Sequence, residues 1–353
     1  MDLNIVSPIN QLGYGIAGTN ITKELAKENN VSLWIIGGAE VKDQATADIL
    51  RQCIENSRSF NYNAPCIKIW HQHDMAQMAG RGPRIGFPFF ELDTFSDVEK
   101  HNLMSLDKIF VSCQWAKDVC LKNLNISEDK VCIVPLGVDS TVFKPTFFQN
   151  KEQTIFFNCG KWEIRKGHDI LVHIFNKAFT ESDNVELWMM CDNPFLPDGE
   201  KEAWENAYKS SKLGSKIKII HRCETQEQVY NTMKNVDCGI FPSRAEGWNL
   251  ELLELMSCGK QVITTNYSAH TEYCNESNSY LVPIKSLEKA SDGKWFFGQG
   301  NWAKIFEDEI DMFVEHMRHV HKNKSMNKSG IETAKKFSWS NSAQEVIKHV
   351  QLF

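Results

Sequence analysis

Short β-rich runs alternate with helical patterns along almost the entire chain, and this alternation limits the folds that the chain can adopt. The predicted strands are short and largely apolar, and they fall at Leu3–Ser7, Val31–Ile36, Cys66–Trp70, Ile85–Phe89, Lys108–Ser112, Val131–Leu136, Thr154–Cys159, Val185–Cys191, Lys216–His221, Cys238–Phe241 and Gln261–Thr264. The predicted helices lie between them, at Ile16–Glu28, Ala45–Ser57, Asp97–Ser105, Trp115–Asn123, Lys166–Phe179, Glu200–Ser211, Gln226–Asn235 and Trp248–Ser257. Apolar strands separated by helices are typical of parallel sheets covered on both faces. The sequence therefore predicts an α/β protein built on doubly wound parallel sheets.

The length of the chain predicts two such sheets, because 353 residues exceed what one ordinary core holds. A buried strand ends in proline and glycine within residues 135–145, so we expect the joint between the domains there. We expect a first domain over residues 1–146, a second over residues 147–336, and a helical tail from Trp302 onward. Two domains of this kind would hold a ligand in a cleft at the carboxyl ends of their strands.

Composition and charge argue against several classes of protein. The net charge of −6 and the lack of a basic stripe argue against a nucleic-acid partner. The apolar runs fall far short of the roughly 20 residues that a membrane span needs, although peripheral membrane contact stays open. The N-terminus enters a predicted strand without a signal peptide, and the eleven cysteines form no C-x-x-C pair. We therefore expect reduced core thiols and a cytoplasmic protein.

A glycine motif, Gly13-Tyr-Gly15-Ile-Ala-Gly18, follows the first predicted strand. Its G-x-G-x-x-G spacing, with Glu40 after the second strand, matches the fingerprint of a dinucleotide site. In that fingerprint the glycines follow the strand almost at once, whereas residues 8–12 intervene here. The interpretation that we favour is a flexible glycine loop whose backbone N–H groups approach a phosphate or a sugar. A simple turn between strand and helix is the structural alternative.

A cationic segment, Gly160-Lys161-Trp-Glu-Ile-Arg165-Lys166-Gly167, lies between a predicted strand and a predicted helix. Cations at this place would meet a diphosphate at the helix N-terminus and stabilise it as a leaving group without a metal. We assign this role to Lys161 and Lys166 and expect Arg165 to be solvated.

Two carboxylates, Glu246 and Glu254, stand eight positions apart at and inside an apolar helical run. The helix start at residues 247–249 offers free N–H groups to a phosphate. Glu254 falls among leucines and a methionine, where carboxylates are rarely buried unless they bind something. Together with the cationic segment, this pattern indicates a site for a nucleoside diphosphate that carries a sugar.

Further polar residues follow two strands of the first predicted domain. His71, His73 and Asp74 either form part of a metal site or border an acceptor site, and we find no third ligand that favours the metal. Glu91 and Asp93 either orient an acceptor hydroxyl or cap the segment that follows them.

These motifs together resemble those of GT-B glycosyltransferases, and are most similar to the retaining group called glycosyltransferase family 4. The resemblance rests on Val134-Pro-Leu-Gly-Val-Asp139 with Phe143-Lys-Pro145, on the segment from Gly160 to Gly167, and on Glu-x7-Glu ahead of Cys258-Gly-Lys-Gln-Val-Ile-Thr. Phe337-Ser-Trp339-Ser resembles the turn into the final helix, residues 337–353, which in GT-B enzymes packs back on the first domain.

The resemblance implies a role for each candidate residue. Glu246 would hold the hydroxyls of the donor sugar, Glu254 those of the ribose, and Lys161 and Lys166 the diphosphate. The full predicted donor site comprises Gly13, Gly15, Lys161, Lys166, Arg222, Glu246, Gly247, Trp248, Asn249, Leu250 and Glu254. The predicted catalytic residues are Glu246, Lys166, Lys161 and Glu91. The implied reaction transfers a sugar with retention of configuration and needs no metal or other cofactor.

This chain departs from the family pattern at three positions. Lys161 replaces the usual arginine, and so offers a point charge instead of a fork. Asn249 replaces the usual glycine, which asparagine can do because it adopts left-handed backbone angles more readily than most residues. Glu91 lies in the segment where many members carry a histidine. A UDP, GDP or ADP sugar and a glycan, lipid or protein acceptor all stay open, as do an epimerase or hydrolase of the same fold and a non-catalytic sugar-nucleotide binder.

Overall fold

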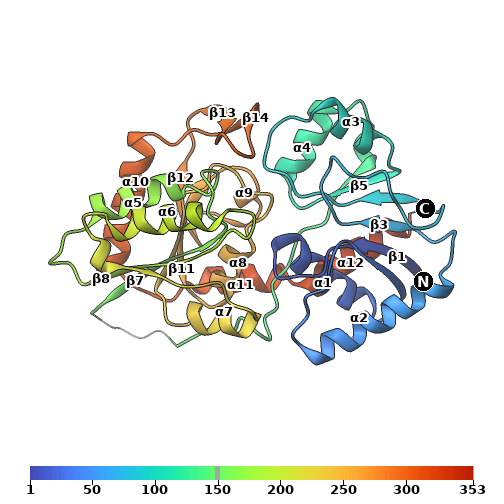
Figure 1. Ribbon diagram of the computed structural model, residues 1–353, viewed down its shortest axis with the longest axis horizontal. Coiled ribbons are helices and arrows are strands. Elements are labelled where there is room, and N and C mark those ends of the chain that lie inside the picture. The colour runs from blue at the N-terminus through green and yellow to red at the C-terminus, as the bar shows by residue number, and fades with distance from the viewer. Residues whose placement is uncertain (148–151, 353) are drawn as a thin grey trace. The chain divides into compact units, whose positions relative to one another are not determined.

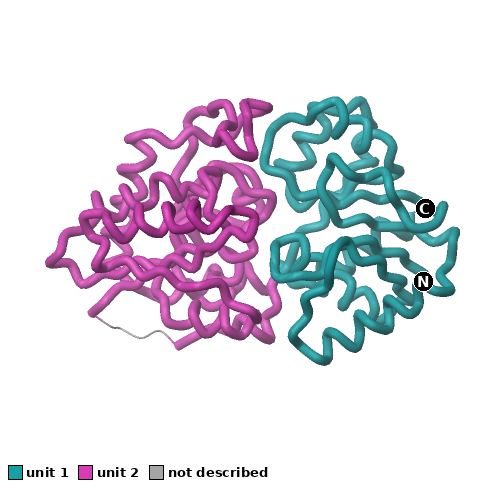
Figure 2. The backbone as a smooth tube through the Cα atoms, in the orientation of Figure 1, with its two compact units in different colours: residues 1–137, 337–353 teal, residues 138–336 magenta. Residues whose placement is uncertain are grey.

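The computed structural model describes residues 1–147 and 152–352. The chain divides into two compact units, the first made of residues 1–137 with 337–353 and the second of residues 138–336 (Figure 2). Within the described residues, no helix is both long and apolar enough to cross a membrane. All eleven cysteines are free thiols, and most of them are buried.

The first unit contains a six-stranded sheet with the order β2-β1-β3-β4-β5-β6, and every pair in it is parallel. Its strands are β1 (Asp2–Ser7), β2 (Asn30–Ile35), β3 (Cys66–Lys68), β4 (Arg84–Gly86), β5 (Lys108–Val111) and β6 (Val131–Ile133). Its helices are α1 (Gly13–Leu25), α2 (Gln44–Asn56), α3 (Asp97–Met104), α4 (Gln114–Asn123) and α12 (Trp339–Val350) (Figure 1).

The second unit contains another six-stranded parallel sheet, with the order β12-β11-β10-β7-β8-β9. Its strands are β7 (Thr154–Gly160), β8 (Val185–Cys191), β9 (Ile217–Ile219), β10 (Cys238–Phe241), β11 (Gln261–Asn266) and β12 (Tyr280–Pro283). Its helices are α5 (His168–Ala178), α6 (Asp198–Lys209), α7 (Gln226–Met233), α8 (Leu250–Ser257), α9 (His270–Tyr273), α10 (Glu307–Lys322) and α11 (Lys328–Lys336). In Figure 1, α5, α6 and α10 lie on one side of this sheet, and α7, α8 and α11 lie on the other.

The two parallel sheets confirm the predicted fold class. The sheet of the second unit is held by apolar side chains such as Phe156, Leu187 and Ile240, which are fully buried together with Phe175 of α5 and Phe313 of α10. A strand that is apolar on both faces needs helices on both sides, which is why the alternation in the sequence is a reliable guide here.

Helix α12 belongs to the first unit although it ends the chain. It packs against α1, and the Ser342 hydroxyl donates to the carbonyl of Pro135 at 2.6 Å. The chain leaves the first unit after Gly137, within residues 135–145 where the joint is expected, but before the predicted domain boundary between residues 146 and 147. Residues 138–147 lie with the second unit, because the Phe143 carbonyl accepts a hydrogen bond from the Ser257 hydroxyl of α8.

An antiparallel hairpin was missed by the sequence analysis. Strands β13 (Leu287–Ser291) and β14 (Phe297–Ala303) pair with each other, and Trp302 lies in β14. The tail is helical as predicted, in α10, α11 and α12, but its first helix begins at Glu307 and not at Trp302. The turn is organised by Asp292, whose Oδ1 accepts three backbone N–H groups. Two glycines interrupt the apolar pattern of β14, so periodicity does not identify this strand.

Candidate functional site

In the second unit, two loops leave the carboxyl ends of neighbouring strands where the strand order reverses. Residues 161–167 join β7 to α5, and residues 242–249 join β10 to α8. β10 pairs with one side of β7, while the chain continues from β7 to β8 on the other side. In open α/β sheets, ligands bind at such a reversal. Both segments that the sequence analysis selected for a nucleotide sugar therefore flank this point.

The first loop fits only because one glycine precedes it and another ends it. Gly167 caps α5 with φ of 75°, and a Cβ atom there would lie 2.1 Å from the carbonyl oxygen of Pro242 in the second loop. The aliphatic stem of Lys166 lies directly against Gly160, the last residue of β7. The small residues thus let the two loops approach each other and let the lysine fold back over the strand end.

The second loop ends in a left-handed residue, Asn249, which has φ of 80°. Its Oδ1 accepts the backbone N–H of Leu252 at 3.2 Å, and its Nδ2 lies 2.9 Å from Nε2 of His270. Asn249 therefore takes the backbone angles expected for the residue that replaces glycine, and it also caps α8. Helix α8 begins at Leu250, two residues later than predicted.

Lys166 and Glu246 meet across the two loops. Nζ of Lys166 lies 2.9 Å from Oε1 of Glu246, and the Ser243 hydroxyl donates to the same oxygen at 2.8 Å. The backbone N–H of Glu246 donates to the Ser268 hydroxyl at 2.8 Å. Both partners are more than nine-tenths buried, so the structure holds the carboxylate in one orientation at the strand ends.

The charges of this pair stabilise one another. Burial alone would raise the pKa of Glu246, but the cations of Lys166 and Arg165 bring it well below its ordinary value. Burial alone would lower the pKa of Lys166, but the facing carboxylates of Glu246 and Glu251 raise it above its ordinary value. Both groups are therefore charged near neutral pH.

Arg165 is not solvated, so that prediction is wrong. Its guanidinium group is 4% exposed and lies between two carboxylates, with Nη1 2.9 Å from Oε2 of Glu246 and Nη2 2.7 Å from Oε2 of Glu163. The other oxygen of Glu163 lies 2.8 Å from Nζ of Lys161, whose side chain is 38% exposed. The pKa of Glu163 is lowered to about 2, because the cations of Arg165 and Lys161 outweigh the effect of burial. Neither Glu163 nor Ser243 was selected from the sequence, because each contacts charged residues of its own loop that only the folded loop brings close.

A second arginine, Arg244 of the loop 242–249, also holds the two loops together. Its guanidinium group forms two 2.8 Å bonds to the carboxylate of Asp169 and also donates to the carbonyl of Ile164. Its backbone N–H donates to the carbonyl of Arg165 at 2.7 Å. This clamp does not involve Glu246.

Glu254 lies inside α8 and is 6% exposed. Within the described part of the chain, no hydrogen bond or ion pair of its carboxyl group is recorded. Burial, and secondarily the charge of Glu251, raise the pKa of Glu254 well above its ordinary value. A buried carboxyl of this kind is costly to the fold, which is the reason to assign it a ligand.

The remaining predicted residues of the second unit lie after β10, apart from Arg222, which lies after β9. Trp248 is buried against the ring of Tyr273, whose hydroxyl donates to the carbonyl of Trp248 at 2.8 Å. Gly247 precedes Trp248, and Leu250 opens α8 as a buried residue. Arg222 is exposed in the loop after β9, the edge strand of this sheet.

The glycine motif lies in the first unit and is not a loop. Gly13 is the first residue of α1, and Gly15 lies in its first turn. A Cβ atom at Gly15 would lie 2.2 Å from Oδ1 of Asn10, so close packing of the helix on the preceding loop requires this glycine. Helix α1 begins three residues earlier than predicted, and the expectation of a flexible loop is wrong.

Tyr14, between these glycines, ties α1 to the segment after β4. Its hydroxyl donates to the carbonyl of Phe89 at 2.8 Å and accepts the N–H of the same residue at 2.7 Å. The ring of Tyr14 also contacts that of His71, with centroids 4.6 Å apart. Glu91 follows in the same segment, and its charge contributes to the raised pKa of the Tyr14 phenol, after burial.

The two histidines and the aspartate after β3 do not converge as a metal site. The rings of His71 and His73 stack with centroids 5.3 Å apart, while Asp74 pairs with the buried Lys68 at 3.2 Å. Across the described ranges, no group of three or more histidine, cysteine, aspartate or glutamate side chains is arranged to hold a metal ion.

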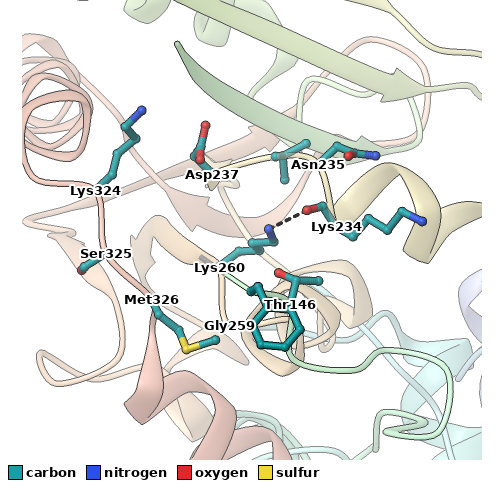
Figure 3. Close-up of a pocket in the computed structure, with 11 residues that line it drawn as sticks. Thr146, Lys234, Asn235, Asp237, Gly259, Lys260, Lys324, Ser325 and Met326 are labelled. Atoms are coloured by element: carbon teal, nitrogen blue, oxygen red, sulfur yellow. Dashed lines mark hydrogen bonds between the residues drawn. The ribbon is translucent and has the colours of Figure 1, made fainter. Parts of the chain in front are cut away.

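A small pocket lies at the other end of the strands of the second sheet, near the amino ends of β10 and β11 (Figure 3). Asp237 and Gly259 line it, and Nζ of Lys260 donates to the carbonyl of Lys234 at 2.8 Å. None of the predicted site residues lines this pocket.

Comparison with known families matches residues 153–292 to the family described as glycosyl transferases group 1. This range contains both loops of the site. Among curated proteins, the chain is 22% identical over 199 residues to the N,N'-diacetylbacillosaminyl-diphospho-undecaprenol alpha-1,3-N-acetylgalactosaminyltransferase of Campylobacter jejuni. It is 22% identical over 200 residues to the GPI3 subunit of the phosphatidylinositol N-acetylglucosaminyltransferase of Saccharomyces cerevisiae. These matches cover 55% and 54% of the chain but only 48% and 43% of the relatives, so the chain spans about half of their length.

Solved structures share the fold over the whole chain. The sucrose-phosphate synthase of Thermosynechococcus elongatus aligns with a TM-score of 0.73 at 14% identity, over 100% of this chain and 98% of that one. Alr3699/HepE of Anabaena, solved with UDP-glucose, aligns with a TM-score of 0.71 at 12% identity, over 100% of both chains. The protein thus has the fold of GT-B glycosyltransferases, and its residues 153–292 match the glycosyl transferases group 1 family.

Proposed function

We propose that the protein is a glycosyltransferase that binds a nucleoside-diphosphate sugar at the loops 161–167 and 242–249 and transfers the sugar to a hydroxyl acceptor. The observation that carries the proposal is the buried contact between Lys166 and Glu246 at the reversal of strand order. It places a cation and a fixed carboxylate where ligands bind in sheets of this type. The family match over the same residues supports the same class of reaction.

The geometry supports separate roles for the two kinds of charge. Lys161 and Lys166 would face the diphosphate, where fixed positive charge stabilises the leaving group as negative charge develops on it. The carboxylate of Glu246 already accepts from Lys166, Ser243 and Arg165 within the described structure. A carboxylate has about four acceptor positions, so one remains for a sugar hydroxyl.

We propose further that the transfer retains the configuration of the sugar and needs no metal. Retention of configuration rests on the resemblance of the two segments to the retaining group of family 4. Independence of a metal rests on the cations, because they supply the charge that a metal would otherwise provide. The names of the two curated relatives make N-acetylglucosamine and N-acetylgalactosamine the first donor sugars to test, and lipid-linked acceptors the first acceptors. The UDP-glucose in the Alr3699/HepE structure makes UDP the first nucleotide to test.

A thermal-shift and calorimetric screen of UDP, GDP, ADP and their sugars tests the donor assignment. Binding to the folded state alone raises the melting temperature with ligand concentration. We expect one nucleotide class to bind, and donor turnover to persist in excess EDTA. Failure of every nucleoside diphosphate to bind would remove the proposal, and abolition of activity by the chelator would remove only the metal-independent mechanism. Donor consumption without an acceptor would favour a hydrolase or epimerase, and binding without any turnover would favour a non-catalytic binder.

A further inference from the structure

Five charged side chains alternate in sign across the two loops, and we name them the charge chain: Lys161, Glu163, Arg165, Glu246 and Lys166. The contacts run from Lys161 to Glu163 at 2.8 Å, from Glu163 to Arg165 at 2.7 Å, from Arg165 to Glu246 at 2.9 Å and from Glu246 to Lys166 at 2.9 Å. Each lysine stands at one end, and each has a carboxylate as its neighbour.

Exposure rises from the middle of the charge chain to its ends. The side chains of Arg165, Glu163 and Glu246 are 4%, 5% and 5% exposed, whereas those of Lys166 and Lys161 are 10% and 38% exposed. Arg165 is held further by the carbonyl of Ala245, which accepts from Nη1 at 2.8 Å. Lys161 is thus the accessible end of the charge chain, Lys166 is its buried end, and the arginine is its fixed centre.

The two carboxylates of the charge chain need the cation of Arg165 between them. Without Arg165, two lysines face two carboxylates, and each ammonium group is needed to compensate a buried carboxylate. A diphosphate would then compete with Glu163 and Glu246 for the same two cations. With Arg165 in place, both carboxylates retain a buried counter-ion when the lysines turn to a ligand. The five side chains of the charge chain together then carry a net positive charge.

We propose that Arg165 is a positioning residue, which neutralises Glu163 and Glu246 together and so leaves Lys161 and Lys166 available to the donor diphosphate. This inference rests on the proposed function of the site. An arginine suits the role because its planar fork presents donors to two carboxylates at once, whereas a lysine offers one point charge.

The alternative is that Arg165 only holds the two loops together. Arg244 provides the matched control, because it clamps the same loops through Asp169 and Ile164 without a bond to either carboxylate of the charge chain. If holding the loops were the whole role, Arg165→Met and Arg244→Met would impair the site alike.

The test is calorimetric titration of the full chain with the nucleoside diphosphate that the wild type binds and with the matching monophosphate. We expect Arg165→Met to weaken binding of the diphosphate at least 10-fold and binding of the monophosphate much less. Arg244→Met should change the affinity for both nucleotides equally. The double variant Arg165→Met/Glu163→Gln should recover part of the lost affinity, because it removes a carboxylate that had lost its counter-ion. Arg165→Lys, a milder change that guards against misfolding, should bind the diphosphate several-fold more weakly than the wild type.

Each of the three Arg165 variants can overturn the inference. A folded Arg165→Met or Arg165→Lys variant with wild-type affinity for the diphosphate would do so. A double variant that binds no better than Arg165→Met would reduce Arg165 to a loop clamp. If the wild type binds no nucleoside diphosphate, the proposed function fails, and this inference fails with it.

Discussion

Nζ of Lys166 lies 2.9 Å from Oε1 of Glu246, although 80 residues separate them in the sequence. The contact exists because β7 and β10 are neighbours in the sheet, which brings the loops after them together. The proposed roles of Lys166 and Glu246 in donor binding both depend on this contact.

Lys166→Ala should lower donor turnover by about 10²-fold or more, because it removes fixed positive charge from the place where charge develops on the leaving group. Steady-state kinetics with the identified donor measure the effect. Lys177→Ala is the control, since Lys177 pairs on the surface with Glu307 and Asp311. Near-wild-type turnover by Lys166→Ala would contradict the assignment.

Glu246→Gln should reduce sugar transfer more than it reduces binding of the nucleoside diphosphate. The carboxylate is proposed to hold the sugar, and a neutral amide accepts hydrogen bonds from hydroxyls more weakly. Calorimetry and a transfer assay on the same preparation separate the two effects. An equal loss of binding and transfer would mean that Glu246 serves the fold of the loops.

Glu254→Leu should stabilise the ligand-free protein by about 1–2 kcal/mol, because it removes a buried carboxyl for which no partner is recorded in the described structure. The same variant should lose nucleotide affinity, since the carboxyl is proposed to bind the ribose. Urea denaturation and calorimetry give the two values, and Glu254→Gln should lie between wild type and Glu254→Leu in both. A Glu254→Leu variant with unchanged nucleotide affinity would contradict the assignment of Glu254 to the ribose.

Asn249→Ala should destabilise the second unit by about 1 kcal/mol more than Asn249→Gly. Both changes remove the cap of α8 and the contact with His270, but only alanine is strained at φ of 80°. Urea denaturation of the two variants measures the difference. Equal stability would show that the backbone relaxes from the left-handed region without cost.

The stability that Glu163 contributes should depend on pH between about 4.5 and 2. Its pKa is lowered in the folded state from 4.5 to about 2, so its contribution is complete above 4.5 and is lost as the pH falls through 2. The free energy of unfolding of the wild type should exceed that of Glu163→Gln by no more than about 3 kcal/mol above this window, and the difference should shrink within it. A difference that does not change with pH would mean that the Glu163 carboxylate gains nothing from Arg165 and Lys161.

Much of the candidate site could be selected from the sequence because its chemistry is local. A cationic segment flanked by two glycines and a glutamate within a leucine run stand out in the linear sequence, and so Lys166 and Glu254 were selected. Arg165 was misjudged because a loop arginine is usually solvated. One of its two carboxylate neighbours, Glu246, comes from the facing loop, which only the tertiary structure brings close. The hairpin from β13 to β14 was missed because its pairing depends on a turn built by Asp292 and not on periodicity.

The sequence by itself determined the fold class, since a strand that is apolar on both faces must be covered by helices on both sides. It also identified the positions that can hold charge at the strand ends. Only the tertiary structure decided which of these charges meet. The order of the strands, which no local pattern encodes, places the loop after β7 beside the loop after β10 and so pairs both Lys166 and Arg165 with Glu246.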